Sequence, residues 1–80
     1  MYGKDKDLSE FGQKLKLLRI QKNVSIREVS GVTNISRSNI SDYENGKVDP
    51  SLSSAKALAD YYQVSLDWLV GVSAVKKIAN

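Results

Sequence analysis

The stretch from Ser36 to Lys47 holds the side chains with the most specific chemistry in this 80-residue chain. Five hydrogen-bonding side chains stand near its start, at Arg37, Ser38, Asn39, Ser41 and Asp42. Arginine can donate two parallel hydrogen bonds to guanine, asparagine can pair with adenine, serine can contact a base or a phosphate, and aspartate can accept from the N4 amine of cytosine. We interpret these five residues as candidate contacts to base edges in the major groove of DNA.

Three of these residues have simpler alternatives. Arg37 could be an exposed and solvated side chain. Asn39 stands three residues after Ser36, a spacing that also suits local capping of a helix. An aspartate is unusual opposite a polyanion, so Asp42 could instead act against other bases or face solvent. The sequence leaves these alternatives open.

The charge is unevenly distributed along the chain, whose net charge is +3. Residues 11–47 carry seven basic and three acidic side chains, a net of +4, whereas residues 48–71 carry one basic and three acidic side chains, a net of −2. A basic front and an acidic back suit a protein that presents one side to a polyanion, although a mixed solvated surface has the same composition. Donors in the basic part are candidate phosphate contacts. They are Lys14, Ser25, Arg27 and Ser36.

The chain has neither cysteine nor histidine. Disulfides, thiolate nucleophiles and thiolate metal sites are therefore excluded, and the commonest general base and metal ligand is missing. We expect no catalytic residue, no metal, no cofactor and no enzymatic activity. No apolar run approaches the ~18–20 residues of a membrane span, and the N-terminus lacks the apolar stretch of a signal peptide. A cytoplasmic protein without membrane contact is the expectation.

Apolar spacing predicts an all-α domain of five helices over residues 8–71. The first helix has an apolar stripe spaced three, four and three residues apart, with its cap at Asp7 or Ser9 and its end near Lys22. The other helices are marked by capping residues at their starts and turn residues at their ends. The expected starts are Ser25, Ser36, Asp49–Ser51 and Ser65, and the expected ends are Asn34, Asn45–Gly46, Val64 and Gly71.

The segments outside these helices are short. Residues 1–7 are expected to form a flexible N-terminal arm. Residues 72–80 could form a loose sixth helix, a dimer contact or the start of a linker.

The segment from Ser25 to Gly46 is predicted to be a short helix, a tight turn and a second helix. Such a pair can place its second helix in the major groove if an apolar stripe holds that helix on the scaffold. The expected inner residues are Val29, Ile35, Ile40 and Tyr43, and Ile26, Val29 and Val32 are expected to share one face of the first helix of the pair. The polar side chains from Ser36 to Asp42 would then face outward.

Five stretches in this order resemble the lambda Cro/cI-type (XRE-type) helix-turn-helix repressors, over about residues 8–71. They are FGQKLKLLR (11–19), SIREV (25–29), ISRSNISDYENGK (35–47), DPSL (49–52) and VSLDWLVG (64–71). The chain departs from the family at Ser30, where alanine is usual, at Asn34, where glycine is usual, and at Thr33, a position that is usually apolar. Ile26 stands where the family often has a side chain that bonds a phosphate, and isoleucine cannot do so.

The resemblance implies a sequence-specific regulator of transcription, a repressor, that binds duplex DNA as a homodimer on near-palindromic half-sites about 34 Å apart. It assigns phosphate contacts to the loop of Asn45, Gly46 and Lys47, and it implies an ion pair between Arg19 and Glu44 that orients the reading helix. The dimer interface is expected around the fifth helix. Its expected residues are Val64, Leu66, Trp68, Leu69 and Val70. For Trp68, a place in the core or the interface is expected rather than a role in stacking on bases.

Two alternatives remain. The chain could be the DNA-binding part of a longer repressor, or an antitoxin-like module that uses the same helices to bind another protein. A protein or peptide regulator is also possible for this family. The resemblance points to a bacterial or phage source.

Overall fold

The computed structural model describes residues 3–71, with side chains from Glu10 onward, as five α-helices. They are α1 (Gly3–Lys22), α2 (Ile26–Thr33), α3 (Arg37–Glu44), α4 (Leu52–Tyr62) and α5 (Leu66–Val70). The predicted all-α class is confirmed. None of the helices in this part of the chain has both the length and the apolar character that crossing a membrane requires. Residues 72–80, for which the sequence left three possibilities, lie outside the described residues.

α1 begins earlier than the sequence indicated. The helix starts at Gly3, so the cap expected at Asp7 or Ser9 is wrong, and residues 3–7 form the first turns of α1 instead of an arm. The physical reason is that residues 4–7 are lysines and aspartates. Neither residue type breaks a helix.

A serine caps the start of each of the other four helices. The serines of α2, α3 and α5 are the ones predicted, and the serine of α4 lies within the predicted start at Asp49–Ser51. The four hydroxyl oxygens accept hydrogen bonds from backbone N–H groups three residues ahead, at 2.9–3.1 Å. Each bond satisfies one amide that the first helical turn leaves without a partner, and contributes about 1 kcal/mol. These serines are Ser25, Ser36, Ser51 and Ser65.

The turn between α2 and α3 is held from both sides. Asn34 has a left-handed backbone (φ 65°), a conformation that asparagine tolerates better than most residues. The Thr33 hydroxyl donates to the carbonyl of Val29 at 2.8 Å and accepts from the N–H of Ile35 at 3.3 Å, which explains a polar residue at an inner position. Val32, expected to share one face with Ile26 and Val29, is 67% exposed and does not share the buried side of Val29, so that expectation is wrong. Thr33 is half-buried instead.

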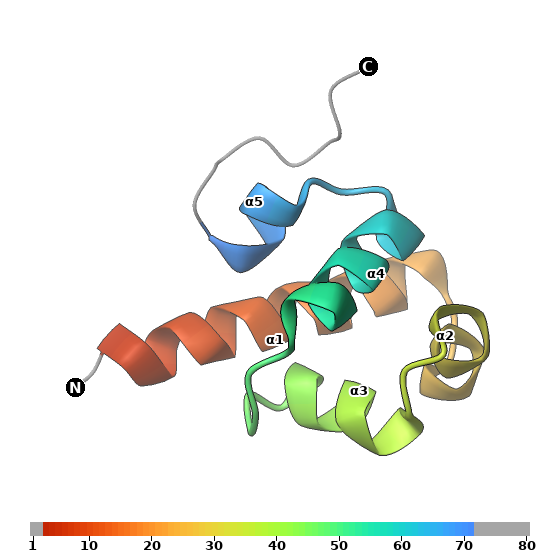
Figure 1. The fold of residues 1–80 in the computed structure, drawn as a ribbon, viewed down its shortest axis with the longest axis horizontal. Helices are drawn as coiled ribbons and strands as arrows, with labels where there is room; N and C mark the ends of the chain where they lie inside the picture. Colours follow the sequence, from red (N-terminus) through yellow and green to blue (C-terminus); the bar gives the residue numbers. More distant parts are fainter. Residues whose placement is uncertain (1–2, 72–80) are drawn as a thin grey trace.

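α1 crosses the middle of the molecule, with α3 on one side and α5 on the other (Figure 1). All five helices contribute to one core. Four residues predicted for the inner side of the helix pair are buried in it, namely Val29, Ile35, Ile40 and Tyr43. The buried apolar residues are Phe11, Leu15, Leu18, Val29, Ile35, Ile40, Tyr43, Ala55, Leu58, Ala59, Val64 and Leu69. Burial of each large side chain among them stabilises the fold by about 1.5–3 kcal/mol.

The backbones of α1 and α3 approach closely at Gly12. A Cβ atom placed on Gly12 would lie 2.5 Å from the carbonyl oxygen of Glu44 and 2.6 Å from that of Tyr43. Both atoms belong to the backbone and cannot move aside as the tip of a side chain can. Gly31 in α2 is the opposite case, because a Cβ atom there would have no heavy atom within 4 Å.

We therefore expect the same substitution to have opposite effects at these two glycines. Gly12→Ala should lower the free energy of unfolding by roughly 1–3 kcal/mol, as overpacking does, although alanine is the better helix former. Gly31→Ala should raise it by about 0.5–1 kcal/mol, because only helix propensity changes. Urea unfolding followed by circular dichroism measures both. A Gly12→Ala variant as stable as the unmodified protein would contradict the close approach.

Candidate nucleic-acid interface

α3 has a buried side that fixes which residues face outward. The buried residues are Ile40, Tyr43 and Glu44. Because successive residues are about 100° apart around a helix axis, Ser38 and Asp42 lie on the side opposite this stripe. These two positions therefore form the middle of the outward face.

The other expected base contacts flank that middle line. Arg37 and Asn39 are exposed at the start of the helix, and Ser41 is half-buried. Ser38, Asp42, Ser41 and, at its margin, Asn39 therefore lie on the outward half of α3. Arg37 lies only about 60° around the helix axis from the buried Ile40. It is exposed because it is the first residue of the helix, so it stands beside the outward face and not at its centre.

Hydrogen bonds along α3 show which side chains the fold itself uses. The Ser36 hydroxyl caps the helix by accepting from the backbone N–H of Asn39 at 3.1 Å, and its oxygen lies 3.4 Å from the Ser38 oxygen. The side-chain amide of Asn45 donates to the Ser41 hydroxyl at 3.4 Å. Asn39 thus takes part in the cap through its backbone, and its side-chain amide has no hydrogen-bond partner among the described residues.

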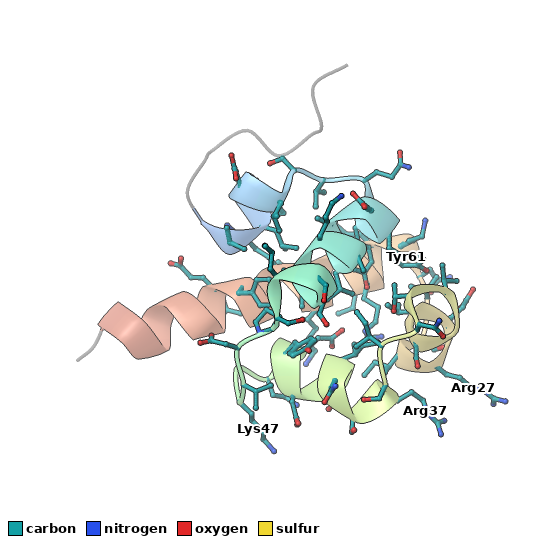
Figure 2. All side chains as sticks on the ribbon, viewed as in Figure 1. Arg27, Arg37, Lys47 and Tyr61 are labelled. Carbon is teal, nitrogen blue, oxygen red and sulfur yellow. The ribbon has the colours of Figure 1, made fainter. Side chains whose placement is uncertain are left out.

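Three basic side chains surround this face. Arg27, Arg37 and Lys47 extend from the same edge of the molecule, along and on either side of α3 (Figure 2). The loop that carries Lys47 is held by Gly46, whose φ is 72°, and by a hydrogen bond from the N–H of Lys47 to the carbonyl of Asp42 at 2.8 Å. Ser36 caps the start of α3, and Asn45, Gly46 and Lys47 follow its end, so these residues expected to bind phosphates border α3. Ser25 is exposed at the start of α2.

Lys14 does not belong to this group. Its ammonium nitrogen donates to the carbonyl of Trp68 at 2.7 Å and lies 4.6 Å from the centre of the Trp68 ring. The ammonium therefore joins α1 to α5, and the expectation that Lys14 contacts a phosphate is wrong. The sequence could not show whether Lys14 lies over an aromatic ring or in solvent, because Lys14 and Trp68 are 54 positions apart.

The expected dimer residues around α5 divide into two groups. Val64 and Leu69 are 4% and 1% exposed within a single chain. They present no surface to a second copy, so their expected place in an interface is wrong; both complete the core instead. Leu66 and Trp68 are half-buried, and Val70 is exposed.

The ion pair expected between Arg19 and Glu44 is present. Arg19 Nε donates to one carboxylate oxygen of Glu44 at 2.8 Å, and its Nη2 donates to the other at 3.2 Å. The remaining Nη1 donates to the carbonyl of Val24 in the loop after α1 at 3.1 Å. The hydrogen bond to Glu44 raises the pKa of Arg19 above its ordinary value, against the effect of burial. The pair joins the end of α3 to α1 and to the loop before α2.

Tyr62 in α4 completes the surroundings of this pair. Burial of its hydroxyl, together with the negative charge of Glu44, raises the pKa of Tyr62 well above its ordinary value of 10.0. Tyr62 is half-buried and packs against the core. Neither its link to Glu44 nor the close approach at Gly12 was predicted; a glycine in the middle of a strong helical pattern was the one available signal.

Loss of the Glu44 carboxylate should destabilise the fold strongly. Glu44→Ala leaves the guanidinium of Arg19, whose side chain is 18% exposed, without its partner, and breaking such a pair costs about 3 kcal/mol. Asp60→Ala is the matched control, because it breaks an ion pair with Lys56 in which both side chains are more than 60% exposed; its expected cost is under about 1 kcal/mol. Urea unfolding measures the two losses, and equal losses would contradict a special role for the Arg19–Glu44 pair.

The raised pKa of Tyr62 predicts alkaline destabilisation. The unfolded chain releases this proton above about pH 10, whereas the folded protein retains it. Stability is therefore full below that pH and falls as the pH rises further. Free energies of unfolding measured between about pH 8 and pH 11 should fall less steeply for Tyr62→Phe than for Tyr61→Phe, its neighbour in α4. The same slope in both variants would contradict the assignment.

Comparison with known proteins matches the sequence to a family model and to two curated relatives. A helix-turn-helix family model matches residues 15–69. The chain is 34% identical over 61 residues to the HTH-type transcriptional activator BcrR of Enterococcus faecalis, covering 76% of this chain and 30% of BcrR. It is 33% identical over 66 residues to the HTH-type transcriptional regulator ImmR of Bacillus subtilis (strain 168), covering 82% of this chain and 52% of ImmR. The match thus spans about half or less of each of these two curated relatives.

The fold has a close counterpart among solved structures. The restriction-modification controller protein C.AhdI from Aeromonas hydrophila superposes with a TM-score of 0.74 at 30% sequence identity, covering 79% of this chain and 96% of that one. The part of the chain that the family model matches, residues 15–69, includes α2, the turn, α3 and α4, with most of α5 and the second half of α1. The chain belongs to the XRE-type helix-turn-helix family.

Proposed function

We propose that this protein is a transcriptional regulator that binds duplex DNA sequence-specifically, with α3 in the major groove. The observation that carries the proposal is a polar helix face held rigidly on the core by the Arg19–Glu44 pair and bordered by Arg27, Arg37 and Lys47 (Figure 2). An α-helix fits the major groove, where base edges present distinct donors and acceptors. The two transcriptional regulators to which the chain is similar, one from Enterococcus faecalis and one from Bacillus subtilis, support this function and a bacterial or phage source, with the cytoplasm as the place of action.

The side chains divide into two tasks. Arg37 reads a guanine, with the polar residues of α3 beside it. The phosphate contacts come from donors that border the face, so most of the affinity depends steeply on salt. These donors are Ser25, Arg27, Ser36, Asn45, Gly46 and Lys47.

A second copy supplies the rest of the specificity. One reading helix covers too few base pairs for a useful specificity ratio, and a two-fold pair of helices on half-sites about 34 Å apart doubles the site. Val70 is exposed and Leu66 and Trp68 are half-buried on α5, which leaves apolar surface for a partner there. A dimer bound across a promoter blocks access to it, so the proposed action is repression. Expression of a reporter gene from that promoter, with and without the protein, shows whether transcription falls or rises.

Selection from a pool of random duplexes at two salt concentrations tests the function. Enrichment of a near-palindrome with half-sites one helical turn apart is expected, and a single half-site would contradict the dimer. Arg37→Ala should lose one guanine preference, by about 1–3 kcal/mol. Lys47→Ala should weaken all duplexes alike and lower the salt slope by about one.

Lys56→Ala, on the exposed side of α4, is the control and should change neither preference nor slope. Absence of duplex binding by the unmodified protein at low salt would overturn the proposed function. That result would favour the alternative function, a module that binds another protein.

A further inference from the structure

The half-buried side chain of Asp42 forms no hydrogen bond or ion pair that would stabilise the fold within the described residues. The contact that Asp42 does make comes from its backbone carbonyl, which accepts from the N–H of Lys47. A negative charge near the end of a helix is also unfavourable with the helix dipole. Glu44, in the same turn, is compensated by Arg19, whereas Asp42 is not compensated.

Because of its position, the carboxylate of Asp42 meets any molecule that binds to the outward face of α3. It lies opposite the buried stripe of Ile40, Tyr43 and Glu44, in the middle of the outward face. Arg37 and Lys47 extend from the two ends of that face (Figure 2), and neither forms an ion pair with Asp42 within the described part of the chain. A surface that closes over this face therefore removes water from an anion that the protein does not neutralise.

The chemistry of the groove then limits the partner. An ionised carboxylate only accepts hydrogen bonds, so phosphate oxygens, guanine O6 and N7 and thymine O4 cannot pair with it. Two groups in the major groove can donate to it, the N4 amine of cytosine and the N6 amine of adenine. Adenine places its N7 acceptor beside N6, next to the carboxylate, so cytosine is the better partner.

We propose that Asp42 makes binding conditional on a cytosine at one base pair near the centre of each half-site. The inference rests on the proposed function, and it goes further by assigning the chemistry that this position reads. Asp42 acts mainly by rejection, because at guanine or thymine its carboxylate loses water without gaining a donor, and at adenine the donor comes with an acceptor beside it. The expected discrimination is on the order of ten- to a hundredfold.

The test uses the same selection from random duplexes, followed by titration of duplexes that differ at this base pair alone. Asp42→Ala should lose the cytosine preference and bind non-specific duplexes several-fold more tightly, because a charge that repels phosphate is gone. Asp42→Asn should shift the preference toward adenine, with which an amide pairs in two hydrogen bonds. Both variants should unfold at the same urea concentration as the unmodified protein or a higher one.

Glu10→Gln is the control, since it removes one negative charge from the exposed side of α1; it should leave the cytosine preference intact. If the unmodified protein enriches an operator and Asp42→Ala enriches the same one with the same discrimination, this inference is overturned and the proposed function stands. If the unmodified protein enriches no operator, the proposed function fails first.

Discussion

The contact between α1 and the end of α3 is the constraint on which the rest of the structure depends. Gly12 lets the two backbones meet, and the Arg19–Glu44 pair fixes the contact with two hydrogen bonds. The third bond of Arg19, to Val24, ties the loop before α2 to the same point. The direction in which α3 presents its polar face is therefore set by α1, and not by the short turn alone.

A buried pair of this kind is not mainly a source of stability, because removing two charges from water offsets much of their attraction. Its effect here is geometric. The planar guanidinium accepts one arrangement of the Glu44 carboxylate, so α3 cannot rotate about its own axis without breaking both bonds. A helix that rotated by one residue would replace Ser38 and Asp42 at the centre of the outward face, and the chemistry of the surface would change.

α1 connects the two surfaces that the protein presents. Its contacts with α3 and α5 lie on opposite sides of the helix (Figure 1). Arg19 serves the first contact, and Lys14 serves the second through Trp68. A rigid helix of 20 residues thus fixes the distance and the angle between the polar face of α3 and the apolar surface of α5. In a two-fold dimer that uses both surfaces, this geometry would set the spacing of the two reading helices.

The sequence by itself determined the elements and their order, because caps, turn residues and apolar spacing act over three or four positions. The serine caps, the turn at Asn34 and the inner residues Ile40 and Tyr43 were all predictable from that local chemistry. The Arg19–Glu44 pair came from the resemblance to a family, since its partners are 25 positions apart.

Only the tertiary structure decided which outward side chains are used within the chain and which are left for a partner. Lys14 is held by Trp68, Val64 and Leu69 are covered by the core, and Asp42 has no partner among the described residues. The physical reason is that burial and pairing depend on residues far away in the chain. No local pattern shows which of two similar side chains a distant helix will cover.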